Sequence, residues 1–301
     1  MLGAARHGTW RARRGGMANA LPAAVLAAAA VLAACRHPDP TNLAVEAVVA
    51  SAARLPTAAA GEPLRVATYN IHHIDGDRLA AALVADPDLA AAQVIFLQEV
   101  VRPRDADSAA CAVGRRHGWH CAYAPGHGLD GGSLGVAILS RRPLVDVEAI
   151  ELPYFNVRFN AGRRVALAVT VEVGGTAVRM YSVHLDNRLN PGERIRQLAP
   201  VFDDAGRWDG PALIAGDMNT SPFVWLGHVV PVPAGVQDDR LEGFVRSRGF
   251  TTPVVASGPT HQWLSMRLDA IYARGLRVLA YAVEHDVRVS DHLPMWADVT
   301  L

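Results

Sequence analysis

Acidic, amide and imidazole side chains recur where apolar segments of this chain begin or end. They are Asn70, Glu99, His184, Asp217, Asn219, Asp269, Asp291 and His292. Catalytic groups are usually mounted on loops at the ends of a rigid scaffold, so this placement indicates a site. Each residue alone also has an ordinary explanation, such as a turn, a cap or a hydrogen-bonded histidine. The site hypothesis therefore rests on the set and not on any single member.

The residue types in this set suit the hydrolysis of a phosphate ester. Such a reaction needs groups that neutralise the phosphate charge, activate a water molecule and help the leaving oxygen depart. Carboxylate and amide oxygens are the hard ligands that Mg²⁺ prefers. An imidazole, with a reference pKa near 6.5, is a natural proton acceptor. We therefore expect a metal-assisted site.

Short β-rich runs separated by polar loops must position these residues. Their alternation predicts strands over 64–70, 94–98, 120–123, 135–140, 145–151, 165–173, 177–184, 212–217, 268–273, 277–283 and 295–299. Helical spacing predicts helices over 77–84, 105–116, 191–205 and 238–247. Gly174-Gly175 is a strong hairpin signal between two strands. Antiparallel hairpins mixed with crossover units indicate an α/β or α+β fold with mixed sheets.

The polar strand ends also form an ordered series of short motifs. These are T-Y-N-I at 68–71, L-Q-E at 97–99, A-I-L-S-R at 137–141, S-V-H-L at 182–185, G-D-M-N at 216–219, R-L-D-A-I at 267–271 and S-D-H at 290–292. The series resembles the endonuclease/exonuclease/phosphatase superfamily, which is deoxyribonuclease I-like. The resemblance covers nearly all of residues 64–299. It implies an α/β four-layer sandwich of two packed mixed β-sheets flanked by helices, with the active site at one end.

The resemblance also implies which residues would hold the metal ion. Glu99 would be the first ligand of Mg²⁺, with Mn²⁺ as the alternative ion. Asn70 would offer its amide oxygen, and Asp291 would be a further ligand or a partner of one. The substrate would be a phosphate ester in a nucleic acid, a phospholipid or a soluble molecule.

The same resemblance assigns catalytic roles to the remaining members of the set. Asp269 would orient His292 and stabilise its charged form. Asp217 would position or deprotonate the attacking water, and Asn219 would bind a phosphoryl oxygen. His184 would contact the phosphate or protonate the leaving group. Which of Asp217 and His292 is the general base stays open.

One motif departs from the apurinic endonucleases of this superfamily. Several of them have an Asp two places after the Asn, where this chain has His72, followed by His73. A zinc site is not favoured, because no Cys or third His lies at a recognisable spacing. We expect looped histidines that face the site or the solvent.

Two other segments invite a functional interpretation. Arg158, Arg163 and Arg164 precede a strand, and an Arg side chain is well shaped to grip a phosphate. The alternative, with equal weight, is that these arginines belong to the ordinary solvated surface. The segment 125–133 contains four glycines without the spacing of a P-loop, so we expect a mobile loop near the site.

The N-terminus has the pattern of an export signal. Four Arg residues precede an apolar run over 20–34, which is too short to span a bilayer comfortably. Small residues before Cys35 resemble a bacterial lipoprotein cleavage box. We therefore expect a signal peptide over 1–34, a lipidated Cys35 with a flexible tether over 35–61, and a catalytic domain over 62–301. The tether could contain a short helix over 43–54, and the protein would be anchored on the periplasmic side of a membrane.

Whether the two remaining cysteines form a disulfide depends on the compartment of the protein. In an oxidising periplasm, Cys111 and Cys121 could form a disulfide. In a reducing compartment they would be two partly buried thiols.

Composition narrows the functional classes. Of the 301 residues, 50% are hydrophobic and 19% are charged, which excludes a wholly disordered chain. Removal of residues 1–34 leaves 25 positive and 29 negative side chains, a net charge of −4. A chain with this net charge lacks the strong positive electrostatic field of a non-specific nucleic-acid binder.

We therefore predict a Mg²⁺-dependent phosphoester hydrolase, foremost a phosphodiesterase, that acts as a monomer. A sphingomyelinase-like phospholipase is one alternative, with residues 223–226 as an apolar wedge. The other alternative is a non-catalytic binding lipoprotein. It is disfavoured because every central polar position of the motifs carries a residue that is competent for catalysis.

Overall fold

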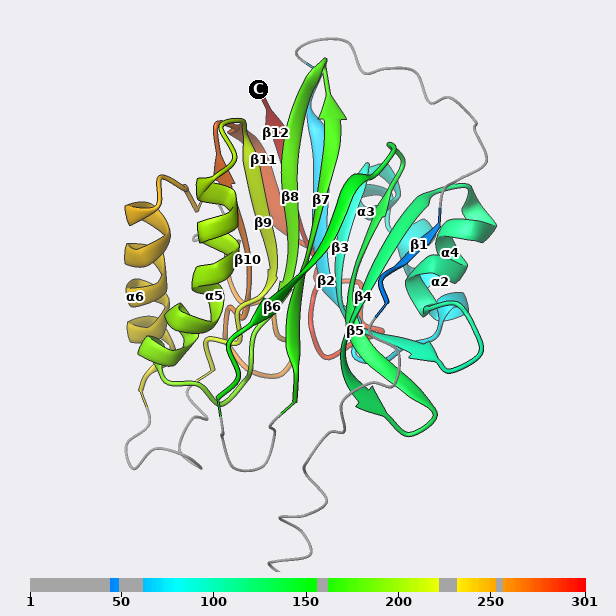
Figure 1. Ribbon diagram of the computed structural model, residues 1–301, viewed down its shortest axis with the longest axis horizontal. Helices are drawn as coiled ribbons and strands as arrows, with labels where there is room; N and C mark the ends of the chain where they lie inside the picture. Colours follow the sequence, from blue (N-terminus) through cyan, green and yellow to red (C-terminus); the bar gives the residue numbers. More distant parts are fainter. Residues whose placement is uncertain (1–43, 49–61, 156–161, 222–231, 253–256) are drawn as a thin grey trace, which may run out of the picture. The chain divides into compact units, whose positions relative to one another are not determined.

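A computed structural model of the chain describes residues 44–48, 62–155, 162–221, 232–252 and 257–301. In these ranges two β-sheets face each other, and helices cover their outer faces (Figure 1). The seven-stranded sheet has the order β1 (Glu46–Val48), β4 (His120–Leu129), β5 (Gly132–Ser140), β3 (Val94–Pro103), β2 (Leu64–Asn70), β12 (Met295–Thr300) and β11 (Arg277–Val283). The five-stranded sheet has the order β10 (Asp269–Arg274), β9 (Ala212–Asp217), β8 (Thr176–His184), β7 (Arg164–Val173) and β6 (Val145–Leu152). The predicted four-layer α/β sandwich is confirmed.

Alternating side chains build the layer between the sheets. In β2, Leu64 and Val66 pack toward the five-stranded sheet, whereas Ala67 and Tyr69 pack toward the helices outside. This period of two is the geometry of a pleated strand, so a strand covered on both faces is apolar at almost every position. The burial of both faces supplies the dominant stabilisation of such a sandwich.

Helices form the two outer layers. The seven-stranded sheet is covered by α2 (Gly76–Ala85), α3 (Pro87–Ala91) and α4 (Ala109–His117), and the five-stranded sheet by α5 (Pro191–Gly206) and α6 (Ala234–Ser247). Helix α4 begins later than predicted, because the Ser108 side chain accepts a hydrogen bond from the Cys111 N–H and caps the helix there. Helix α5 begins with Pro191 after a capping box that joins Asn190 and Glu193.

Strand polarity brings one set of strand ends to the same edge. Strands β2 and β3 are parallel, as are β8 and β9, so the carboxyl ends within each pair lie together. Strand β10 runs antiparallel to β9 with Asp269 opposite Asp217. The start of β10 therefore joins the end of β9, and this edge carries the polar residues singled out above.

Two expectations are wrong. Glu46–Val48, placed in the tether, forms strand β1 instead of a helix and pairs with β4. The segment 125–133 is a hairpin between β4 and β5 and not a mobile loop. Its glycines permit close backbone contact, since a Cβ added at Gly132 would lie 2.1 Å from the Arg102 carbonyl oxygen.

The cysteine pair lies between the seven-stranded sheet and the helices that cover its outer face. Cys111 in α4 and Cys121 in β4 form a disulfide with a Cα–Cα distance of 5.2 Å. Cys35 and the segment 1–34 lie outside the described residues. Within the described ranges, no helix combines the length and the apolar character needed to cross a bilayer.

Candidate active site

The layer between the sheets changes from apolar to polar at one end. Along β9, Leu213 and Ala215 pack into this layer, and Asp217 follows on the same face two residues later. The same period places Asn70 beyond Leu64 and Val66 of β2. The alternation that builds the core therefore also directs the site residues inward.

Hydrogen bonds join the two sheets at this end. The Asn70 Nδ2 atom donates to Asp217 Oδ2 of the other sheet at 2.9 Å and to Glu99 Oε1 at 3.3 Å. One layer further in, Gln98 Nε2 donates to Ser182 Oγ at 3.3 Å. The Asn70 Oδ1 atom accepts the His72 N–H. Asn70 thus positions two carboxylates. Its oxygen has a second lone pair beside the one that accepts the His72 N–H, and its role as a metal ligand stays a prediction.

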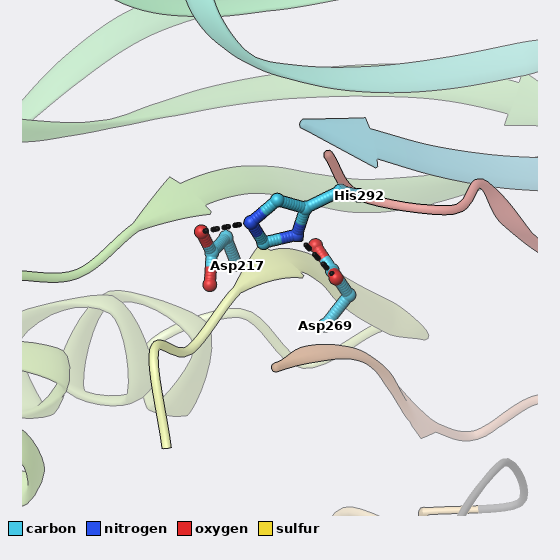
Figure 2. Close-up of side chains that lie close together, drawn as sticks. All are labelled: Asp217, Asp269 and His292. Carbon is cyan, nitrogen blue, oxygen red and sulfur yellow. Dashed lines mark hydrogen bonds and ion pairs between the residues drawn. The ribbon is translucent and has the colours of Figure 1, made fainter. Parts of the chain in front are cut away.

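The imidazole of His292 lies between two buried carboxylates (Figure 2). Its Nδ1 is 2.8 Å from Asp269 Oδ2, and its Nε2 is 3.7 Å from Asp217 Oδ2. Burial alone would lower the pKa of His292, but the charges of Asp269 and Asp217 outweigh burial and raise it. Burial also raises the pKa of Asp217, against the opposing charge of His292.

The second imidazole of the site, that of His184, has a different partner. Its Nε2 is 3.6 Å from Asp217 Oδ2 and 3.8 Å from Glu99 Oε1. Its Nδ1 is 3.1 Å from Arg164 Nη1. Burial and the adjacent Arg164 charge hold the pKa of His184 well below its usual value.

Two further carboxylates lie at the solvent side, each beside a histidine. Glu99 Oε2 is 3.2 Å from His73 Nε2, and Asp291 Oδ1 is 3.3 Å from His72 Nδ1. Burial by itself would raise the pKa of Glu99, but the hydrogen bond from His73 and the nearby imidazoles outweigh it and lower the pKa. The side chains of Glu99 and Asp291 are 22% and 24% exposed, whereas Asp217 is 1% exposed.

This distribution fits a divalent cation at the solvent side. Mg²⁺ uses one or two carboxylates and keeps several waters, which requires ligands that reach solvent. Glu99 and Asp291 meet that requirement. Asp217, Asp269 and His292 also lie close enough together to hold an ion, but they are deeply buried and already contact one another.

Backbone strain is concentrated here. Among the described residues, five that are not glycine have a positive φ, and four belong to the site or its contacts: His72, His73, Glu99 and Asn219. Such conformations persist where the surrounding structure enforces them and are common at functional sites. In β9, Gly216 has φ +150°, and a Cβ there would lie 1.9 Å from the Val183 carbonyl oxygen.

Asn219 contacts Asp217 directly. Its backbone N–H donates to Asp217 Oδ1 at 2.8 Å, and its Nδ2 donates to the Leu185 carbonyl oxygen at 2.8 Å and to Asp217 Oδ2 at 3.2 Å. Asn219 therefore orients the Asp217 carboxylate, and its contact with a phosphoryl oxygen stays a prediction.

The structure thus brings all eight predicted residues into one connected set. Ser290 completes the connection, because its Oγ donates to the Asn70 carbonyl oxygen and lies 3.3 Å from Asp291 Oδ1. Of the three arginines considered, Arg164 joins the site, whereas Arg163 pairs with Glu151 at the surface. Arg158 lies outside the described residues, as does the segment 223–226.

Two residues beside His292, at the solvent-exposed edge of the site, were not predicted from the sequence. His261 pairs by a β-bridge with His292, and their ring centroids are 5.6 Å apart. Trp263 packs edge-on against His261 with a centroid distance of 5.8 Å and is 75% exposed. The sequence around these residues carries no apolar period that would have indicated their position.

Solved structures share this fold. An endonuclease/exonuclease/phosphatase from Beutenbergia cavernae is 24% identical with a TM-score of 0.64, and the match covers 80% of this chain and 72% of that one. The human Nocturnin catalytic domain with bound sulfate is 18% identical with a TM-score of 0.59, over 87% and 98% of the two chains. The 3′ phosphatase NExo from Neisseria, bound to a product DNA hairpin, is 21% identical with a TM-score of 0.56, over 79% and 100%.

Sequence comparison gives the family. No curated protein matches the chain. The profile of the Endonuclease/Exonuclease/phosphatase family matches residues 67–292, from strand β2 to the S-D-H motif. This match spans the whole connected set of site residues, and the chain therefore belongs to the endonuclease/exonuclease/phosphatase family.

Proposed function

We propose that this protein is a Mg²⁺-dependent phosphoester hydrolase that acts foremost on phosphodiesters. The observation that carries the proposal is the line Asp269–His292–Asp217 beside the solvent-facing carboxylate of Glu99. Buried groups that handle protons thus adjoin a carboxylate that can hold a cation. Hydrolysis of a phosphate ester requires both.

Glu99 and Asp291 would hold the cation, with the amide oxygen of Asn70 as a further ligand. When bound, Mg²⁺ supplies positive charge that neutralises the phosphoryl oxygens. Asn70 keeps the Glu99 carboxylate in place through its Nδ2 atom. Mn²⁺ is the alternative ion, since it takes the same oxygen donors.

Asp217 and His292 would handle the proton of the attacking water as one unit. Asn70 and Asn219 both donate to the Asp217 carboxylate and fix its direction. Asp269 fixes His292 through Nδ1, which leaves Nε2 directed toward Asp217. A water within hydrogen-bond reach of both groups would lose its proton to the pair as its oxygen attacks phosphorus. The ester P–O bond would break in the same step, and the leaving oxygen would take up a proton from solvent.

The test is hydrolysis of bis-p-nitrophenyl phosphate by wild type and Glu99→Gln. We expect turnover with Mg²⁺, its loss in EDTA and its recovery on re-addition of the ion. Glu99→Gln should abolish metal-dependent turnover without unfolding, because it removes one ligand charge. The matched control is Glu172→Gln, which changes an exposed residue of β7. Metal-independent turnover, or equal activity of both variants, would overturn the proposal.

The candidate substrates are phosphodiesters of nucleic acids, phospholipids and soluble molecules. A DNA product in one structure of the same fold supports nucleic acid, whereas the net charge of −4 beyond residue 34 counts against avid duplex binding. The panel is plasmid DNA, single-stranded DNA, sphingomyelin and inositol phosphates. Preference for sphingomyelin would favour the phospholipase alternative, and no turnover on any substrate would favour a binding lipoprotein.

We also propose export and lipid attachment at Cys35. The sequence pattern of residues 1–35 supports it, and so does a disulfide between Cys111 and Cys121, since such bonds persist in oxidising compartments. Mass spectrometry of the protein from its own cell should find an N-terminal, lipidated Cys35. An unprocessed residue 1 would contradict this.

A further inference from the structure

The two nitrogens of His184 have unlike surroundings. Arg164 faces Nδ1, and two carboxylates face Nε2. We propose that Arg164 fixes His184 in the tautomer that carries its proton on Nε2, so that His184 binds a phosphoryl oxygen as a neutral donor and does not protonate the leaving group. Arg164 is then a positioning residue that acts through His184. This inference rests on the proposed function for its substrate, but its structural half can be tested separately.

Arg164 is the donor in its contact with His184. A guanidinium has five N–H donors and no acceptor. The Arg164 Nη1 atom lies 3.1 Å from His184 Nδ1, so Arg164 donates and Nδ1 must accept. A nitrogen that accepts through its lone pair carries no proton. The proton of the ring therefore resides on Nε2.

Buried hydrogen bonds hold Arg164 in place. Its Nε donates to Asp186 Oδ1 at 2.7 Å, and the pair is almost fully buried. The other oxygen, Asp186 Oδ2, accepts a hydrogen bond from Gln197 Nε2 at 2.9 Å, and the Asp186 N–H donates to Gln197 Oε1 at 2.8 Å. Helix α5 thus holds Asp186, Asp186 holds the guanidinium, and the guanidinium holds the ring.

The Nε2 atom of His184 lies near two carboxylates without a hydrogen bond to either. Its distances of 3.6 Å to Asp217 Oδ2 and 3.8 Å to Glu99 Oε1 are too long for hydrogen bonds. The N–H therefore points to the place where the proposed water-activating and metal-holding carboxylates converge. A phosphoryl oxygen bound there would accept it. A fixed donor aimed at developing charge is worth about 10²–10³ in rate.

The surroundings of His184 do not suit proton donation. An imidazole that acts as a general acid must first be an imidazolium, with protons on both nitrogens. A proton on Nδ1 would face the Arg164 N–H at 3.1 Å, with no acceptor between them. A neutral imidazole that gave up its Nε2 proton would become an anion beside Asp217 and Glu99. His184 is thus suited to hydrogen bonding and not to proton transfer.

The structural half is tested by ¹⁵N NMR of histidine-labelled full-length protein. We expect a pyridine-type Nδ1 and a pyrrole-type Nε2 for His184, whose signals are identified by their loss in His184→Gln. Arg164→Met should shift this ring toward a mixture of tautomers. Arg164→Lys retains a donor and should preserve the tautomer, which gives a second variant if Arg164→Met fails to fold. A protonated Nδ1 in the wild type would overturn the inference whether or not the protein is an enzyme.

The kinetic half compares an aryl and an alkyl phosphodiester that differ only in the leaving group. We expect His184→Ala to lower kcat by about 10² on both, because a donor to a phosphoryl oxygen is indifferent to the leaving group. His184→Gln, which retains an amide donor, should recover part of this loss. A loss at least tenfold larger on the alkyl ester would show proton donation and overturn the inference. No turnover of either ester by the wild type would instead count against the proposed function.

Discussion

The two histidines of the site have opposite electrostatic surroundings. His292 lies between the carboxylates of Asp269 and Asp217, which raise its pKa. His184 lies about as close to Asp217, but burial and then the charge of Arg164 lower its pKa. The same side chain, at similar burial, is thus prepared for a charge on one side of Asp217 and for neutrality on the other. The partner at Nδ1, and not the residue type, separates the two roles.

The largest expected effect comes from removing His292. His292→Ala should lower kcat by about 10²–10⁴, the contribution of a positioned acid–base group. The loss should be larger than that for His184→Ala, because only His292 takes part in proton transfer. Assays of bis-p-nitrophenyl phosphate hydrolysis at fixed Mg²⁺ measure both. Equal losses, with both variants folded by circular dichroism, would break the distinction between the histidines.

The next prediction compares an Asp→Asn substitution on the His292 side of the site with one on the His184 side. Asp269→Asn should lower turnover while the protein stays folded, because it removes the charge that orients His292. Asp186→Asn should instead lower the free energy of unfolding by about 3 kcal/mol, because it leaves the buried Arg164 guanidinium without its counter-charge. Urea titrations and kcat on the same preparations separate the outcomes. A reversal of the two patterns would refute this assignment.

The disulfide offers a control that is remote from both histidines. Replacing Cys111 and Cys121 by Ala should cost about 2–3 kcal/mol of unfolding free energy, as expected for closure of a ten-residue span. Turnover of the folded protein should not change, since α4 and β4 contribute none of the predicted site residues. A large fall in kcat at temperatures where the variant is folded would contradict this independence.

The smallest expected effect concerns Trp263 at the solvent-exposed edge of the site. The His292 side continues through His261 to the exposed Trp263, whereas the His184 side ends in buried Arg164. With single-stranded DNA as substrate, Trp263→Ala should raise KM about tenfold through the loss of one stacked base, with little change in kcat. Val145→Ala, an exposed apolar residue of β6, is the control. An unchanged KM would remove Trp263 from substrate binding.

Strand alternation explains why much of this arrangement follows from sequence. Leu64, Val66 and Asn70 share one face by their spacing, and so do Leu213, Ala215 and Asp217. Once two such faces are packed together, their polar ends must meet. The family motifs supply the pairing of strands that periodicity alone leaves undefined.

The missed features depend on tertiary contacts that leave no local pattern. Arg164 looked like one of three surface arginines, and only its pairing with Asp186 and His184 distinguishes it from Arg163. The glycines of 125–133 suggested a loop, but close contact with neighbouring backbone requires small residues in a hairpin as well. Trp263 packs on His261, which joins the site through a β-bridge to His292 across 31 positions.

The bond from Asn70 to Asp217 crosses from one sheet to the other. Apolar packing between sheets has no preferred direction and tolerates substitutions that conserve volume. Hydrogen bonds do not tolerate such displacement, because a shift of 1 Å breaks them. Variants that repack Phe96 or Met180 between the sheets should therefore lose turnover before they lose the folded state. Enzymatic activity in this protein would then report the alignment of its two sheets more sensitively than any measurement of unfolding.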